Sequence, residues 1–142
     1  LEFMPWTAVK SARQAIAVVE AAGSPDWAGV LVDALHFARS ATTPADIAAI
    51  PRRWLHYAQI CDAPAEIPST DDALIHTARQ ERLLPGEGGI DLQGMFAALP
   101  TDLPVSVEVP NYLRVPDLGE REWARQALTA SRNVLGDDGL SQ

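Results

Sequence analysis

The sequence is poor in cysteine and has no long apolar run. Its 142 residues include one cysteine, Cys61, so an internal disulfide is excluded and a reducing compartment is the natural interpretation. The longest apolar stretches, such as residues 28–31, fall far short of the roughly 20 residues that cross a bilayer. The N-terminus also lacks a basic region followed by an apolar one. These absences predict a cytoplasmic protein with no membrane partner.

Positive charge is scarce as well. The 11 lysines and arginines are outnumbered by 19 acidic residues, giving a formal net charge of −8, and no basic cluster is present. Such a chain repels phosphate backbones, so nucleic acid is not an expected partner. The apolar content of 47% suffices, at this length, to build one globular domain without disulfides.

Strand and helix patterns alternate four times along the chain. Apolar and β-branched runs predict strands at residues 1–4, 28–32, 57–61 and 105–109. Helical spacing and capping residues predict helices at residues 7–22, 43–50, 71–80, 91–99 and 118–135, followed by a polar tail at 136–142. Repeated strand–helix units of this kind form parallel sheets with right-handed crossovers. The predicted fold class is therefore α/β, with four βα units forming half of a (β/α)₈ TIM barrel.

The chain is short for a complete barrel, which usually needs about 250 residues. It also begins inside a predicted strand. We therefore expect the N-terminal half-barrel to be removed, to lie in a separate chain, or to be replaced by a second copy in a homo-oligomer. Without such a partner the outer strands would present unpaired backbone groups and an apolar face to water.

Each predicted strand carries one polar side chain at or near its C-terminal end, namely Glu2, Asp33, Gln59 and Glu108. In a closed barrel these ends converge on the face where catalytic residues lie. Burying three carboxylates and an amide without a partner is costly, and a hard divalent cation with oxygen ligands offsets that cost. The alternative is that they are ordinary strand-end residues that cap helices or bind loop amides. Their recurrence in four successive units favours a metal site.

Five short stretches of the sequence carry a family resemblance: LEFMP at 1–5, VDALH at 32–36, QICD at 59–62, LPGEG at 84–88 and SVE at 106–108. They resemble strands five to eight of the xylose isomerase-like barrels. That superfamily includes sugar and sugar-phosphate isomerases and epimerases, inosose dehydratases and 3-dehydroshikimate dehydratases. The resemblance implies that residues 1–142 form the C-terminal half of such a barrel.

The resemblance also implies roles for individual residues. The four strand-end residues would bind a divalent ion (Mn, Mg, Co or Zn). Many epimerases of the family have histidine as the third ligand, whereas this chain has Gln59, as bacterial 3-dehydroshikimate dehydratases do. His36 would contact a substrate hydroxyl or carbonyl, and Arg82 would bind a substrate carboxylate or phosphate, with Arg39 as a second candidate and Trp6 lining the pocket. The alternatives are a packed histidine and solvated arginines.

The implied chemistry is proton abstraction next to a carbonyl of a small sugar, polyol or keto-acid. Glu2, Glu108 and His36 would be the catalytic residues, and the metal would stabilise an enediolate. Returning the proton gives isomerisation or epimerisation, whereas expelling a β-hydroxyl gives dehydration. The related apurinic endonucleases bind zinc through many histidines, and three histidines argue against that activity. An inactive half-barrel that self-associates is the non-enzymatic alternative.

The glycine-rich segment at residues 85–89 superficially suggests a phosphate-binding loop. It lacks the Lys-Ser/Thr of a P-loop and does not connect a strand to its helix at the required spacing. We interpret it as a turn that shapes the rim of the site.

Overall fold

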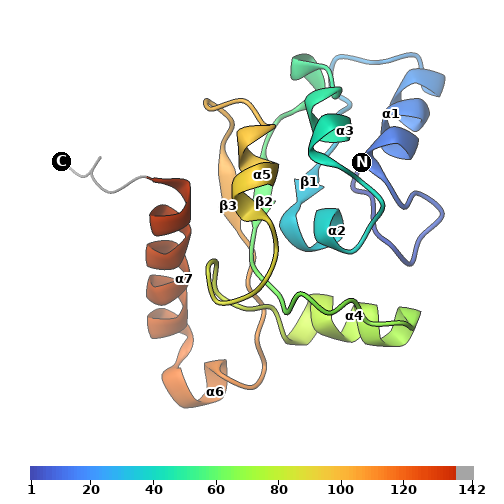
Figure 1. The fold of residues 1–142 in the computed structure, drawn as a ribbon. Helices are drawn as coiled ribbons and strands as arrows, with labels where there is room; N and C mark the ends of the chain where they lie inside the picture. Colours follow the sequence, from blue (N-terminus) through green and yellow to red (C-terminus); the bar gives the residue numbers. More distant parts are fainter. Residues whose placement is uncertain (137–142) are drawn as a thin grey trace.

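The computed structural model describes residues 1–136; residues 137–142, which belong to the predicted tail, lie outside that range. A parallel sheet in the order β1-β2-β3 forms its centre, as Figure 1 shows. Its strands are β1 (Val32–Asp33), β2 (Ala58–Ile60) and β3 (Val105–Val107). The α/β prediction is confirmed.

The predicted first strand contributes only one parallel bridge, between Glu2 and Leu31. It does not extend to Met4, because the Met4 N–H donates to the carbonyl of Val9 at 2.9 Å and the chain turns there. The fourth parallel segment of the predicted half-barrel is therefore present, but it is much shorter than expected.

Helices follow each of these segments, and their bounds differ modestly from the predictions. The helix expected at 7–22 begins later, because Ser11 and not Thr7 provides its cap. The helix expected at 118–135 is divided at Gly119, whose φ of +80° is incompatible with a continuous helix. The helices are α1 (Ala12–Ala21), α2 (Ala34–Ala38), α3 (Pro44–Ala48), a 3₁₀ turn (Arg52–Trp54), α4 (Asp71–Gln80), α5 (Leu92–Ala97), α6 (Val115–Leu118) and α7 (Glu120–Leu135).

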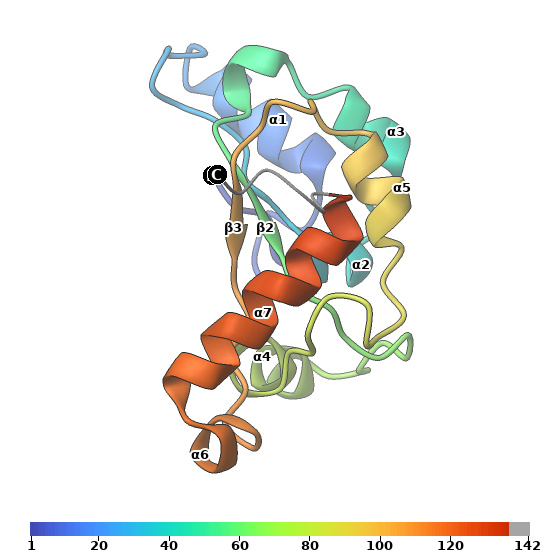
Figure 2. The same cartoon turned by 90° about the vertical axis from the view of Figure 1, so that its left-hand side faces the viewer.

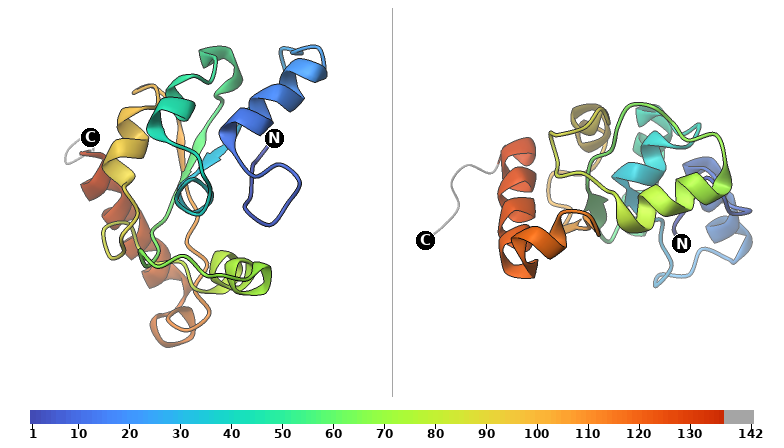
Figure 3. Two further views of the ribbon diagram at one scale, coloured as in Figure 1. Left: turned by 45° about the vertical axis from the view of Figure 1, so that its right-hand side comes forward. Right: turned by 90° about the horizontal axis from the view of Figure 1, so that it is seen from below.

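Four of the helices cover one face of the sheet. In Figure 2, α1, α3, α5 and α7 follow one another around that face, and successive members of this row contact each other. Helices α4 and α6 lie instead beyond the carboxyl ends of the strands, as the views in Figures 1 and 3 show. The core of the described residues is formed by buried apolar side chains, and the largest of those that are fully buried are Trp54, Phe3, Leu35, Ile47, Ile60 and Met95.

Strand β3 forms an open edge of the sheet. A groove of about 640 Å³ runs beside it, between β3, α5 and α7. Val105 and Val107 line the groove from the strand, and Leu128 and Leu135 line it from α7. No helix among the described residues is both long and apolar enough to cross a membrane.

A capping box begins α3 and connects it to α1. The Thr43 side chain accepts from the Asp46 N–H at 3.2 Å, and Asp46 accepts from the Thr43 N–H at 2.9 Å. Asp46 also forms an ion pair with Arg13 of α1. The hydrogen bonds from Thr43, followed by the one from Arg13, hold the pKa of Asp46 below its usual value of 3.8.

This lowered pKa predicts a pH-dependent effect of Asp46→Asn on the melting temperature. Because the folded-state pKa lies below the unfolded value, the carboxylate stabilises the fold above about pH 3.8 and loses its effect as pH falls through the folded-state pKa. We expect the variant to melt below the wild type near neutral pH, and the difference to shrink as pH falls below 3.8 through the folded-state pKa. The exposed Asp26→Asn variant serves as the control; an equal pH-dependent difference there would contradict the assignment.

Candidate active site

The register of the sheet places the four predicted metal ligands on one face. Asp33 pairs with Gln59, and Gln59 pairs with Ser106. Paired residues point to the same face of a sheet, and so does every second residue along a strand. Glu108 therefore shares the face of Ser106. Glu2 is paired with Leu31, two residues before Asp33, so Glu2 shares the face of Asp33. Val105 and Val107 point the other way, into the groove beside α7. The four polar residues therefore lie on the face turned away from the helix row.

Two of these carboxylates form a cluster with His36. The His36 Nε2 atom lies 3.5 Å from Glu2 Oε1 and 4.0 Å from Asp33 Oδ1. Helix α2 starts directly after β1, and Asp33 caps it by accepting from the His36 N–H at 3.1 Å, which fixes the imidazole beside the strand end. One ligand atom from each of the three residues lies within 4.8 Å of the others. Trp6 packs edge-on against His36, with the ring centroids 5.1 Å apart.

Arg82 lies against the remaining carboxylates. Its Nη1 donates to Asp33 Oδ2 at 2.7 Å and lies 3.1 Å from Glu108 Oε2, while Nε donates to the Ala78 carbonyl at 2.8 Å. Asn111 holds the backbone of Arg82 through a 3.0 Å hydrogen bond to its carbonyl. The sequence predicted a substrate anion as the partner of Arg82, whereas the structure pairs its guanidinium with two of the predicted metal ligands.

Burial and mutual repulsion shift the pKa values in this cluster. Burial, followed by repulsion from Asp33 and Glu108, raises the pKa of Glu2 to about 7. Burial also raises the pKa of Glu108, against the opposing charge of Arg82. For His36 burial lowers the pKa to about 4, so its imidazole is neutral near pH 7. Burial alone would lower the pKa of Arg82, but Asp33, Cys61 and Glu108 raise it above its ordinary value.

An unsatisfied polar atom on this face is compatible with a cation. Among residues 1–136, the buried Gln59 Oε1 atom makes no hydrogen bond. A buried polar atom without a partner costs about 1–3 kcal/mol, and an amide oxygen can regain that energy by binding a cation. Carboxylate oxygens, an amide oxygen and a neutral imidazole form a donor set suited to a divalent ion. The residues present therefore fit the predicted metal.

A pocket of about 400 Å³ gathers most of the predicted site residues. Glu2, Trp6, His36, Arg82 and Glu108 all line it. Two further lining residues, Arg79 of α4 and Tyr112, were not predicted, because a surface helix and a loop gave no sequence signal that they reach the site.

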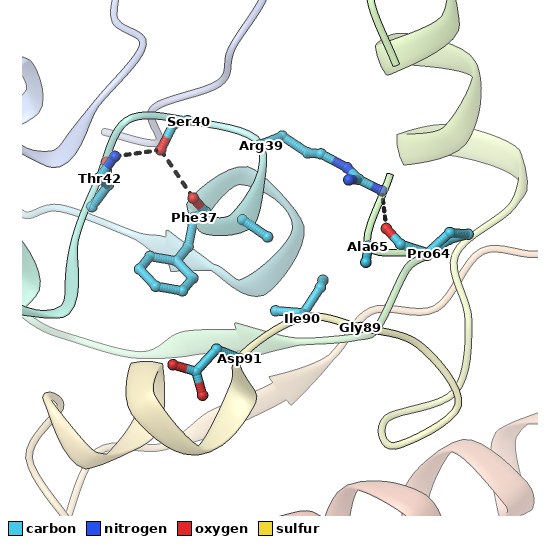
Figure 4. Close-up of a pocket in the computed structure, with 10 residues that line it drawn as sticks. Phe37, Arg39, Ser40, Thr42, Pro64, Ala65, Gly89, Ile90 and Asp91 are labelled. Atoms are coloured by element: carbon cyan, nitrogen blue, oxygen red, sulfur yellow. Dashed lines mark hydrogen bonds between the residues drawn. The ribbon is translucent and has the colours of Figure 1, made fainter. Parts of the chain in front are cut away.

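Arg39 is not brought to this pocket. It lines a separate pocket, where its Nη2 donates to the Pro64 carbonyl at 2.7 Å, as Figure 4 shows.

The glycine-rich segment is held by one buried carboxylate. Asp62 accepts four backbone N–H groups at 2.8–3.1 Å, from Ala63, Gly86, Gly88 and Ile90. A Cβ atom at Gly88 would lie 2.3 Å from the Ala63 carbonyl oxygen, so only glycine fits there. In the described chain, no residue of 85–89 lines the pocket that contains Glu2, and the segment lies instead in a hollow near α7. The prediction that it shapes the rim of the site was therefore wrong.

Comparison with known proteins agrees with this architecture. The family model of the xylose isomerase-like TIM barrel matches residues 1–134. The chain belongs to this family. Its members are mostly enzymes, isomerases and epimerases among them. A comparison with curated proteins gave no match.

Solved structures of xylose isomerase-like barrels superpose on most of the chain. A crystal structure of the IOLI protein with a bound zinc atom has a TM-score of 0.81 at 22% identity and covers 99% of this chain. A xylose isomerase-like TIM barrel/4-hydroxyphenylpyruvate dioxygenase fusion protein has a TM-score of 0.67 at 28% identity, covering 78%. A xylose isomerase domain protein from Alicyclobacillus acidocaldarius subsp. acidocaldarius has a TM-score of 0.66 at 25% identity, covering 96%.

The chain spans only part of each of these structures: 50% of the first and third, and 18% of the fusion protein. The fold is thus that of a half-length piece of the family's barrel.

Proposed function

We propose that the chain carries the metal site of a divalent-metal-dependent sugar or sugar-phosphate isomerase or epimerase. The observation that carries the proposal is the shared sheet face of Glu2, Asp33, Gln59 and Glu108, with His36 beside Glu2 and Asp33.

Glu2, Asp33, Gln59 and Glu108 would hold the ion. Mn, Mg, Co and Zn all suit such donors, and the zinc atom in the IOLI structure supports zinc as one of the ions to test. When bound, the ion polarises the carbonyl oxygen of the substrate and stabilises the negative charge that develops on it.

The side chains of the pocket would move the protons. The carboxylate of Glu2 or Glu108 takes a proton from the carbon next to the carbonyl, and the electron pair of that C–H bond shifts toward the carbonyl oxygen. His36, neutral near pH 7, hydrogen-bonds a substrate hydroxyl or carbonyl. Returning the proton to the former carbonyl carbon gives isomerisation, with the hydroxyl proton of the neighbouring carbon passing to the former carbonyl oxygen. Returning the proton to the opposite face of the original carbon gives epimerisation.

A dehydratase acting on a cyclic keto-polyol or keto-acid is the second candidate, and Gln59 is the residue that favours it. Many epimerases of the family carry histidine at this position, whereas bacterial 3-dehydroshikimate dehydratases carry glutamine. After the same proton abstraction, the electron pair expels a β-hydroxyl, which a protonated carboxyl of the pocket converts to water. Screening 3-dehydroshikimate and inosose beside sugars and sugar phosphates separates the two activities.

The open edge at β3 supports a proposal about assembly. Its unpaired backbone and the apolar groove between β3 and α7 suit further βα units, which close the barrel in longer relatives. These units would come from an N-terminal half-barrel or from a second copy of the chain. The complete pocket would then include residues from both halves.

Metal binding tests the proposed site directly. Titrating Mn²⁺, Co²⁺ or Zn²⁺ into the purified chain, followed by calorimetry and thermal shift, is expected to give stoichiometric binding. Removing a ligand in Glu108→Ala is expected to weaken it at least about 100-fold, since even outer-shell substitutions cost 10–100-fold.

Glu122→Gln is the matched control, because Glu122 is paired with Arg125 on the outer helix α7 and not with the cluster. Equal affinity in wild type, Glu108→Ala and Glu122→Gln would place the ion elsewhere and contradict the proposed function.

A further inference from the structure

Arg39 is a buried cation with no counter-charge among residues 1–136. It lies at the C-terminal end of α2 with 7% of its surface exposed. Its Nη2 donates to the Pro64 carbonyl, while within the described part of the chain Nε has no hydrogen-bond partner and no carboxylate lies within ion-pair distance. Burying an unpaired charge is costly, and burial accordingly lowers the pKa of Arg39.

A pocket of about 260 Å³ adjoins this guanidinium. Three segments enclose it: residues 37–42 after β1, residues 64–65 after β2, and residues 89–91 before α5. Phe37 and Ile90 give it apolar walls, and Arg39 extends along its side toward Pro64 in Figure 4. Among residues 1–136, none lines both the Arg39 pocket and the pocket formed by Glu2, Arg82 and Glu108.

Asp91 is the acidic residue in the lining, and it does not neutralise Arg39. Its carboxylate accepts from the Gly94 N–H at 2.9 Å and caps α5. Figure 4 shows it pointing away from the guanidinium. The positive charge of Arg39 therefore has no carboxylate partner in the pocket among the residues that the structure describes.

We propose that this pocket binds a small oxyanion, the carboxylate or phosphate group of a metabolite, through the Arg39 guanidinium. A guanidinium donates charge-assisted N–H hydrogen bonds to both groups, and an anion here offsets the cost of the buried charge. The volume lies below the roughly 300–1,000 Å³ of drug-sized sites, so it suits one small group with a short carbon part against Phe37 and Ile90. The site is separate from the proposed metal cluster and does not depend on it.

Inorganic phosphate and malonate are the probes, added separately to the purified chain so that the two anion chemistries are distinguished. Binding is measured by calorimetry and by the shift of the Arg39 Nε–H resonance in wild-type protein. Arg39→Met is expected to weaken binding of the preferred anion at least about tenfold, because a charge-assisted hydrogen bond is lost. Arg53→Met, which removes an exposed arginine, is expected to leave the affinity unchanged.

A second variant tests the proposal even if Arg39→Met does not fold. Ala65→Phe fills the pocket from its rim without altering Arg39 and is expected to abolish the same binding. The proposal is overturned if neither anion shifts the Arg39 resonance in wild type. It is also overturned if Ala65→Phe binds the anion as tightly as wild type does. Both results are independent of metal binding, so they are distinct from failure of the proposed function.

Discussion

Replacing Arg82 with methionine is expected to lower the free energy of unfolding of the metal-free chain by about 3–5 kcal/mol. The variant would leave the fully buried Asp33 without its 2.7 Å ion pair and would bring Asp33, Glu2 and Glu108 together without a positive charge. Breaking one side of a buried pair costs more than the pair itself contributes, because the remaining charge stays desolvated. Urea denaturation of wild type and variant in the presence of a chelator measures the difference.

Two further substitutions define what Arg82 contributes. Arg79→Met removes an exposed arginine of α4, three residues before Arg82. This variant is expected to change the free energy of unfolding by less than about 0.5 kcal/mol. Arg82→Lys keeps the charge but loses the Nε bond to Ala78, so its loss should lie between those of the two methionine variants. If Arg82→Met were as stable as Arg79→Met, the buried ion pair would not exist in solution.

Asp62→Asn is expected to lower the free energy of unfolding by about 2–4 kcal/mol although it preserves the side-chain shape. The Oδ2 atom of Asp62 accepts from the N–H groups of Gly86 and Gly88, and Oδ1 accepts from Ala63 and Ile90. An amide keeps one acceptor atom and turns an NH₂ group toward two donors, so two backbone N–H groups lose their partner.

Hydrogen exchange supplies a local readout for this prediction. The amides of Gly86 and Gly88 are expected to exchange faster in Asp62→Asn than in wild type, by more than the global loss of stability explains. Asp102→Asn is the control, since Asp102 lies on the surface and pairs with the exposed Arg52. Unchanged protection at Gly86 and Gly88 would show that Asp62 does not hold this segment.

The periodic parts of the fold were predictable, and the parts that depend on single residues were not. Helix α4 has the predicted bounds of 71–80, because Thr70 caps an amphipathic segment. Helix α2 was missed, since five residues are too short to establish a period. The split before α7 depends on the positive φ of Gly119, which the helical spacing of its neighbours conceals.

In the candidate site, too, one part was predictable from the sequence and another part was not. The strand-end position of Glu2, Asp33, Gln59 and Glu108 follows from alternation along strands, so the shared face was foreseeable. Arg82 contacts Asp33, 49 residues earlier in the sequence, and Glu108, 26 residues later. No local sequence pattern encodes contacts over such separations. The roles of these residues in metal binding and catalysis stay predictions.

The contact between Arg82 and two carboxylates also bears on whether folding has to await metal binding. A zinc finger stays unfolded without its metal, because ion binding supplies the free energy of folding. Here a guanidinium supplied by the chain itself already balances Asp33 and Glu108. Folding can therefore precede binding at the proposed metal site, and exchange of one divalent ion for another there would not require the chain to unfold.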